Sequence, residues 1–475
     1  MVFSSVQFLF FFLPVVLGVY FASPKRARNA VLLVASLLFY LWGAGELVAL
    51  LLCSILVNYG FGLAVGAAQD RGDQARAKLL VGLDITVNLA LLGYFKYANF
   101  FVAQIDDLFD AVGVPRIELG SIALPIGISF FTFHGLSYTV DVYRRRCRPL
   151  RSLVDFGLYM TLFPQLVAGP IVRYHEIQEQ FRHRTHSLDD LADGASRFIW
   201  GLAKKVVVAD AVAEVANGAF GLDVGERSFA AAWLGVLAYT LQIYFDFSGY
   251  SDMAIGLARM FGFRFPENFN RPYSSYSITD FWRRWHITLS NWFRDYLYIP
   301  LGGNAGGART YANLLIVFFA TGLWHGANWT FVIWGLYHGG IMLVERVTGW
   351  RFIDRAPHPA LNRAVTLLLV AVGWVLFRAP DVHTALDFYR SMLNPFSGTS
   401  TDLVTLGLGR RNLVVLLLGS AVFFLPRTVA FGRLVEYSRA QWVDPARIAL
   451  VGVALPYTAV IVISGTFSPF LYFQF

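Results

Sequence analysis

Long apolar runs separated by short polar connections constrain the fold of this chain more than any other feature of its sequence. Hydrophobic residues make up 56% of the 475 residues and charged residues only 15%, whereas an average soluble protein has about 25% charged residues. Eleven runs meet the hydropathy criterion for transmembrane helices. They cover roughly residues 6–22, 30–43, 46–67, 79–101, 121–140, 228–246, 311–324, 328–344, 363–377, 411–425 and 447–464. We therefore predict an all-α polytopic membrane protein with about eleven transmembrane helices.

Two interior stretches do not fit a simple span. Residues 155–176 are apolar but are interrupted by Pro164, Gly169 and Pro170, which predicts a re-entrant or half-spanning segment. Residues 261–310 combine many aromatic residues with arginines. Irregular and charged chain survives near a bilayer only where protein or a water-filled cavity covers it, so interfacial helices are expected here.

Basic connections alternate with less basic ones along the chain, and this alternation predicts the orientation of the chain in the membrane. The first, third and fifth connections are basic, whereas the connection at 102–120 has four acidic residues and only Arg116 as a base. Because basic loops stay in the cytoplasm, we predict that the N-terminus is periplasmic, on a retained first helix that lacks the features of a signal peptide. The basic connections contain Lys25, Arg26, Arg28, Arg71, Arg76, Lys78, Arg144, Arg145, Arg146, Arg148 and Arg151. The net charge of +8 therefore does not indicate a nucleic-acid partner.

His325 lies in the segment FFATGLWHGANWTF, where it is the only ionisable side chain of an apolar run. A titratable group at membrane depth is a candidate functional residue. Helical spacing puts Asn328 on the same face, where its amide could set the imidazole tautomer. Gly322 and Gly326 leave room for a substrate or for neighbouring backbone. The alternative is a core histidine bonded to a carbonyl, which is the commoner situation for a single buried histidine.

His286 lies in FWRRWHITLSNWFRDY, where helical spacing puts Arg283 and Ser290 on its face. The same segment is crowded with Trp and Arg, so an interfacial anchoring helix explains its composition equally well. His286 and His325 could act together only if their helices pack against each other. The residues alone leave that open.

Other polar residues carry weaker signals. Asp246 ends an apolar run, and the Ser248-Gly249-Tyr250 sequence behind it suggests a broken helix that lines a cavity. Asp84, with Asn88 one turn on, is interpreted as a polar link between helices. His134 is interpreted as a core histidine with satisfied hydrogen bonds. His338 cannot share a site with His325 within one straight helix, because 13 residues rotate it about 220° away.

Several familiar kinds of site are not indicated. His175, His183 and His186 lie in a polar loop without the ligands that would complete a metal site, and Cys53 and Cys147 fit neither a disulfide framework nor a metal spacing. We therefore predict no metal. The chain has no Walker A, HExxH or GxSxG motif. What remains is acid–base chemistry by histidine, which fits acyl transfer from a thioester to a hydroxyl.

At these segments the chain resembles the membrane-bound O-acyltransferase family, and most closely its bacterial branch that O-acetylates exopolysaccharides such as alginate. The teichoic acid D-alanine transferases are more distant relatives. The resemblance covers almost the whole chain. It is carried by LPIGISFFTFHGLSYTVDVYR at 124–144, FPQLVAGPIVRY at 163–174, YFDFSGYSDMAIGLARMFGF at 244–263, FWRRWHITLSNWFRDYLYIPLGGN at 281–304 and GLWHGANWTFVIWGLYHG at 322–339.

The resemblance implies a ring of helices around a central tunnel, forming one domain over residues 1–475. Within it we expect N-terminal spans in 1–150, a catalytic core in 151–345 and C-terminal spans in 346–475. The family's invariant histidine falls on His325, and the second polar site of the bacterial branch falls on His286. We interpret His325 as the general base and His286 as its assistant. Residues that bind substrate or support the histidines are then Asp246, Arg283, Trp324 and Asn328.

The resemblance also implies substrates and partners. No tightly bound cofactor is expected, and an acetyl thioester, either acetyl-CoA or an acyl carrier, would arrive from the cytoplasm. Many relatives pass the acetyl group to a periplasmic or membrane-anchored acetyltransferase, so we expect such a partner at the bacterial inner membrane, with an exopolysaccharide as final acceptor. Two alternatives remain: a transporter that moves an acyl group or glycan without forming a bond, and a lipid O-acyltransferase.

Overall fold

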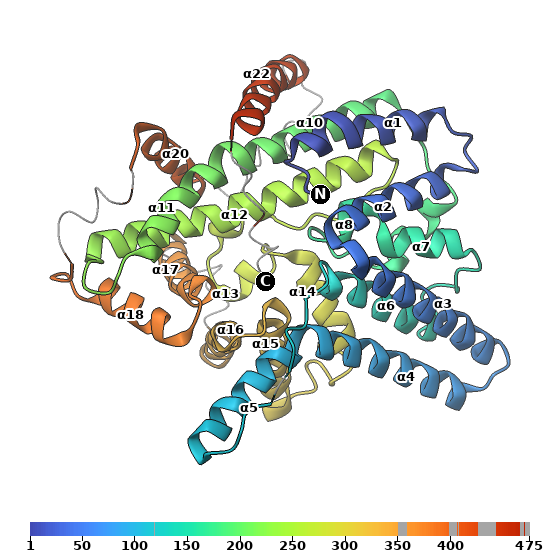
Figure 1. Ribbon diagram of the computed structural model, residues 1–475, viewed down its shortest axis with the longest axis horizontal. Coiled ribbons are helices and arrows are strands. Elements are labelled where there is room, and N and C mark those ends of the chain that lie inside the picture. The colour runs from blue at the N-terminus through green and yellow to red at the C-terminus, as the bar shows by residue number, and fades with distance from the viewer. Residues whose placement is uncertain are drawn as a thin grey trace. The chain divides into compact units, whose positions relative to one another are not determined.

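The computed structural model describes residues 1–117, 119–349, 359–398, 406, 408–425, 443–465 and 470, and its regular elements there are all helical (Figure 1). The prediction of an all-α chain is thereby confirmed. Besides short 3₁₀ and π segments, the helices are α1 (Leu13–Ala22), α2 (Arg28–Ala44), α3 (Val48–Asp70), α4 (Gln74–Leu92), α5 (Ala98–Val112), α6 (Ile128–Tyr143), α7 (Leu153–Thr161), α8 (Phe163–Leu166), α9 (Tyr174–Ile177), α10 (Leu188–Ala203), α11 (Asp210–Gly221), α12 (Phe229–Met260), α13 (Ile278–Trp282), α14 (Ile287–Phe293), α15 (Gly307–His325), α16 (Trp329–Thr348), α17 (Pro359–Arg378), α18 (Val382–Leu393), α20 (Arg410–Ser420) and α22 (Val443–Ser464).

A helix covers most of each of the eleven predicted apolar runs. Within the described residues, three helical stretches are both long and apolar enough to cross a membrane: Arg28–Asp70, Gln74–Val112 and Pro359–Arg378. Two shorter apolar helices cover Phe8–Ala22 and Val451–Ser464. The total of eleven spans therefore stays a prediction.

The chain divides into two compact units. This division does not test the expectation, drawn from the family resemblance, that the chain forms one domain. Unit 1 contains residues 1–187 and 261–265, and unit 2 contains residues 188–260 and 266–475. In unit 1, helices α3, α4 and α6 pack against one another. Asn58 on α3 and Asn88 on α4 exchange side-chain hydrogen bonds of 3.3 and 3.1 Å, and Asn88 also donates to Asp84 at 3.1 Å. Asp84 therefore belongs to a polar link between helices, as predicted.

The apolar run at 155–176 is interrupted, as its prolines and glycine predict. Helix α7 ends at Thr161, α8 lasts only from Phe163 to Leu166, and irregular backbone follows up to Arg173. The side chains in this irregular part are buried, so protein covers the polar backbone that the breaks leave exposed. The depth of the segment in a bilayer stays a prediction.

In unit 2, α10 and α12 lie side by side and antiparallel (Figure 1). Glycines seven residues apart on each helix make the close contact: a Cβ on Gly194 would lie 2.6 Å from the carbonyl oxygen of Gly256, and one on Gly201 would lie 2.5 Å from that of Gly249. Helix α12 runs unbroken for 32 residues. The predicted break after Asp246 is therefore wrong, because Gly249 serves this helix contact and does not end the helix.

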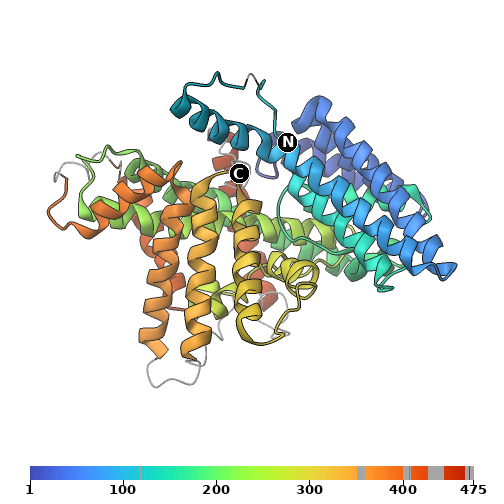
Figure 2. The same ribbon diagram turned by 90° about the horizontal axis from the view of Figure 1, so that it is seen from below.

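Helices α15, α16 and α17 also belong to unit 2 and run side by side (Figure 2). At the crossing of α15 and α16, a Cβ on Gly322 would lie 2.4 Å from the carbonyl oxygen of Phe331, and one on Gly335 would lie 2.2 Å from that of Phe318. The room that Gly322 leaves is therefore taken by neighbouring backbone. The two helices are separated at Gly326, whose backbone is extended.

Candidate active site

Two histidines from distant parts of the sequence meet in unit 2. His325 is the last residue of α15, and His286 immediately precedes α14. The indole of Trp324 contacts both: its ring centroid is 5.9 Å from that of His286 and 4.9 Å from that of His325. Both imidazoles are buried, with exposed fractions of 0% and 3%. The structure therefore brings His286, Trp324 and His325 into one group.

His286 occupies an unusual backbone conformation. Its φ of 44° is in the left-handed region, which non-glycine residues rarely adopt and which costs about 1–3 kcal/mol unless the surroundings hold it in place. The chain turns here between α13 and α14, so the predicted continuous helix with Arg283 and Ser290 on the face of His286 is wrong. The side chain of Arg283 is exposed.

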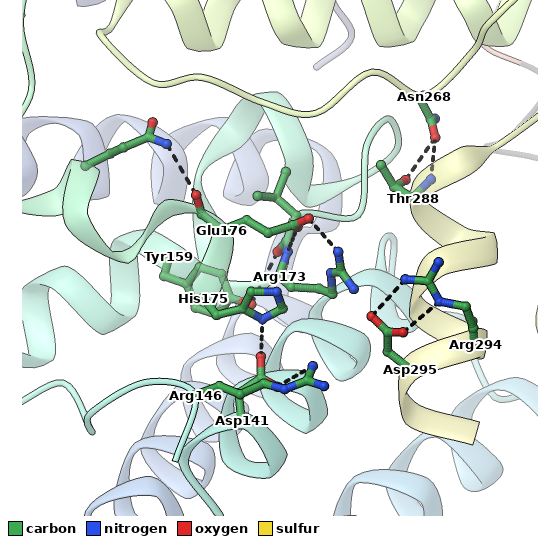
Figure 3. Close-up of polar contacts among 12 residues, drawn as sticks. Asp141, Arg146, Tyr159, Arg173, His175, Glu176, Asn268, Thr288, Arg294 and Asp295 are labelled. Atoms are coloured by element: carbon green, nitrogen blue, oxygen red, sulfur yellow. Dashed lines mark hydrogen bonds and ion pairs between the residues drawn. The ribbon is translucent and has the colours of Figure 1, made fainter. Parts of the chain in front are cut away.

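Asn268 holds His286 from the side of Nδ1. Its Oδ1 is 3.1 Å from Nδ1 of His286. The same oxygen accepts from the backbone N–H of Thr288 at 3.3 Å and from the Thr288 hydroxyl at 2.9 Å, and Figure 3 shows these two contacts. Its Nδ2 donates to the hydroxyl of Ser251 on α12 at 3.1 Å. Sequence reasoning missed Asn268, which lies 18 residues before His286 in an irregular segment that has no helical register to indicate the contact.

This contact assigns the tautomer of His286. A backbone N–H can only donate, so the atom of Asn268 that faces Thr288 is the carbonyl oxygen. The same oxygen faces Nδ1 of His286, which must therefore carry the proton. His286 lies outside the candidate membrane-spanning stretches, and burial lowers the pKa of its imidazole. The ring is then neutral, with the lone pair on Nε2.

Aromatic rings surround His325. The ring centroids of Trp334 on α16 and Phe377 on α17 each lie 5.0 Å from that of His325. Asn328 is not on the face of His325, because the chain is extended at Gly326 and α16 starts after Asn328. Asn328 instead caps α16 by accepting from the backbone of Thr330 at 3.0 Å, and it donates to the carbonyl of Pro380 at 2.5 Å. The prediction that Asn328 sets the His325 tautomer is therefore wrong.

A buried pair of histidines inside an aromatic cluster is suited to acid–base chemistry away from water. The model of the membrane-bound O-acyltransferase family matches residues 128–382, which include both histidines. The chain belongs to this family. It is therefore a membrane protein and an O-acyltransferase, and the resemblance carried by the sequence motifs is confirmed.

Similar proteins in bacteria extend the match to the whole chain. The probable alginate O-acetylase AlgI of Azotobacter vinelandii is 45% identical over 506 residues, covering 100% of both chains. The protein of the same name from Pseudomonas aeruginosa is 48% identical over 423 residues, covering 89% of this chain and 79% of its own. The peptidoglycan O-acetyltransferase of Helicobacter pylori is 37% identical over 431 residues, covering 83% of this chain and 80% of its own.

In this O-acyltransferase, Asp246 is held in a buried ion pair. Its Oδ1 is 2.8 Å from Nζ of Lys205, and both residues are only 2% exposed. Lys205 also contacts Asp210 at 2.7 Å. The next residue on α12, Phe247, packs its ring 4.8 Å from that of His286. Asp246 thus fixes the helix that carries a neighbour of His286, and Lys205 is a partner that the sequence analysis did not identify.

Two further histidines are buried without hydrogen bonds. The ring of His338 lies 5.2 Å from that of Trp334, so one indole contacts both His325 and His338. Neither ring nitrogen of His338 has a hydrogen-bond partner among the described residues, and the same is true of His134 in unit 1. His134 is thus a core histidine as predicted, but the satisfied hydrogen bonds expected for it are not found.

Unit 1 contains a separate polar group near the end of α6. The fully buried carboxylate of Asp141 contacts Nδ1 of His175 at 2.6 Å and lies 3.8 Å from Arg146 (Figure 3). Arg173 and Glu176 pair beside it at 2.6 Å. In the described part of the chain, His, Cys, Asp and Glu residues nowhere gather in a group of three or more that could hold a metal.

Proposed function

We propose that this O-acyltransferase takes an acetyl group from a cytoplasmic thioester, acetyl-CoA or an acyl carrier, and delivers it to an exopolysaccharide hydroxyl. The observation that carries the proposal is the convergence of His286 and His325 on Trp324. The acceptor class is supported by the relatives, whose names specify alginate and peptidoglycan as the polymers that they acetylate. Alginate-like polysaccharide is the acceptor we propose here.

His325 acts as the general base. It takes the proton of the acceptor hydroxyl while the oxygen attacks the thioester carbonyl, and the tetrahedral intermediate then expels a thiolate that accepts the proton. This cycle leaves an ester, a free thiol and a neutral His325. The aromatic rings around His325 exclude water, which would otherwise hydrolyse the thioester.

His286 assists through Nε2. With its proton held on Nδ1 by Asn268, its Nε2 can accept a hydrogen bond from the acceptor hydroxyl or from a proton donor next to it. Trp324 packs against both imidazoles, and the exposed Arg283 is available for the phosphate-bearing arm of the donor. Asp246 and its partner Lys205 support the site through α12.

The acetyl group crosses the membrane during this reaction. We propose an inner-membrane location with a periplasmic N-terminus, based on the alternation of basic and acidic connections. A periplasmic or membrane-anchored acetyltransferase receives the acetyl group in cases where the polymer itself does not reach the site. A hydroxyl on such a partner meets the same chemical requirement as a sugar hydroxyl.

The test uses the full-length protein in liposomes with acetyl-labelled acetyl-CoA on the cytoplasmic side and alginate, with or without periplasmic extract, on the other. We expect alkali-labile label on polymer or on a partner protein, and none with His325→Ala. The exposed His183, replaced by Ala, is the matched control and should leave transfer unchanged. Flux of label without any covalent product would instead support a transporter, and label on lipid would support a lipid acyltransferase.

A further inference from the structure

A group of basic side chains meets in unit 1 where α1 ends and α2 begins, and we call it the Arg28 cluster (Arg28, Arg184 and His186). Nη1 of Arg28 lies 3.4 Å from Nδ1 of His186. Nε2 of His186 lies 2.8 Å from the hydroxyl of Tyr20, which donates to the carbonyl of Phe261 at 3.0 Å. Because arginine only donates, Nδ1 of His186 accepts and the ring is neutral.

Among the described residues, the cluster has no acidic side chain in direct contact with its arginines. In the part of the chain that the structure describes, neither Arg28 nor Arg184 forms an ion pair, whereas Arg197 and Arg259 each pair with two carboxylates. Asp155 is linked to Arg184 through Asn29, which donates to Asp155 at 2.6 Å and accepts from Arg184 at 2.5 Å, so the negative charge of Asp155 acts on Arg184 without a direct contact. Positive charge therefore accumulates here.

The positive charge of the cluster affects the pKa of His186. Burial and then the charges of Arg28 and Arg184 lower its pKa, and Lys25 acts in the same direction. Arg28 donates from Nε to the carbonyl of Ser23 and from Nη1 to His186, so its Nη2 makes no hydrogen bond to the described residues. An anion that accepted from Nη2 would supply the missing negative charge.

The position of the cluster indicates the source of that anion. Arg28 is the first residue of the candidate membrane-spanning stretch Arg28–Asp70. Its guanidinium lies 5.2 and 5.7 Å from the ring centroids of Tyr20 and Phe21 at the end of the apolar α1. Aromatic and basic residues at the end of a span lie at the depth of the lipid headgroups.

We propose that the Arg28 cluster binds the phosphodiester headgroup of an anionic phospholipid. The planar guanidinium of Arg28 offers a fork of N–H donors that matches two phosphate oxygens. Arg184 is held in place over the ring of Phe263 at 4.2 Å and adds a fixed positive charge. The Arg28 cluster belongs to unit 1 and the histidine pair to unit 2, and this proposal does not depend on the proposed reaction.

Native mass spectrometry of the full-length protein in detergent tests the proposal with phosphatidylglycerol, phosphatidylcholine and inorganic phosphate as separate probes. Wild type should bind phosphatidylglycerol about fivefold more tightly per cationic contact than phosphatidylcholine, and Arg28→Gln should lose that factor. Arg28→Lys should keep part of it, because the charge stays while the fork is lost. Arg76→Gln is the matched control: Arg76 is exposed and near the start of the stretch Gln74–Val112, and its replacement should change nothing.

The outcomes separate the possible sources. Equal affinity of wild type for both lipids overturns the proposal, and so does an equal loss in Arg28→Gln and Arg76→Gln, because the effect would then come from surface charge in general. Displacement of phosphatidylglycerol by an equal concentration of inorganic phosphate would assign the site to a soluble phosphate and refute the lipid. Size-exclusion profiles in phosphatidylcholine show whether each variant is folded before its binding is compared.

Discussion

His325 is the residue whose loss should matter most. A positioned general base contributes about 10² to 10⁴ in rate, so His325→Ala should reduce acetyl transfer by that factor while the protein still inserts. Labelled acetyl transfer in liposomes measures the effect, with His183→Ala as the control. A properly inserted His325→Ala protein with wild-type transfer would leave His325 as a core histidine only.

The loss of activity caused by replacing His286 should depend on whether His325 is present. If the two imidazoles form one relay, His286→Ala should be nearly as severe as His325→Ala, and the double variant should lose no more than His325→Ala alone, because groups that act as a unit are not additive. If His286 only positions the acceptor, its loss should be milder and should multiply with that of His325. The comparison of kcat values among the three variants distinguishes these cases.

Asn268 should control the pH dependence through His286. In Asn268→Asp a carboxylate would face Nδ1, and an adjacent negative charge favours the imidazolium and raises the pKa of His286 by about 1–3 units. Because the assisting ring must be neutral, activity should then be lost at a higher pH than in wild type as the pH falls. Asn268→Ala should lower the rate about tenfold, equivalent to one hydrogen bond, without the shift caused by a carboxylate. Identical pH profiles for wild type and Asn268→Asp would contradict this role.

At the scale of elements, the crossing of α15 and α16 holds His325 in place. A methyl group on Gly335 would lie 2.2 Å from the carbonyl oxygen of Phe318, whereas one on Gly340 of the same helix would meet nothing within 4 Å. Gly335→Ala should therefore force the helices apart, cost about 1–3 kcal/mol of stability and reduce transfer. Gly340→Ala should be neutral or slightly stabilising. Thermal unfolding in detergent and the transfer assay measure both, and equal effects would contradict the packing argument.

The sequence predicted where helices occur but only some of the places where they break. The apolar runs all carry helices, because a backbone without water must bond within itself. The break at His286 was missed, since it depends on tertiary contacts: His286 is held in the left-handed region beside Asn268. Conversely, Gly249 suggested a break that does not occur, because a glycine at a helix contact has the same local sequence signature as a glycine that ends a helix.

At the scale of the whole molecule, the meeting of His286 and His325 could not be derived from composition or periodicity. Each histidine alone fitted a structural role, and only the family resemblance favoured a joint site. Asn268 and Lys205 were not recognised, because neither lies in helical register with the residue that it supports. Long-range side-chain contacts of this kind depend on how the helices pack together, and that packing could not be derived from one sequence.

The orientation in the membrane is the last prediction, and the direction of acyl flow depends on it. Eleven Lys and Arg lie in three alternate connections, while the connection at 102–120 is acidic, so the positive-inside rule places the basic connections in the cytoplasm. A reporter fused after Arg146 should therefore be cytoplasmic, and one fused after Asp110 should be periplasmic. Alkaline phosphatase and green fluorescent protein fusions at both positions measure this, since each is active on one side only. The reverse pattern would require the thioester donor to approach from the periplasm, where coenzyme A is absent, and would refute the proposed direction of transfer.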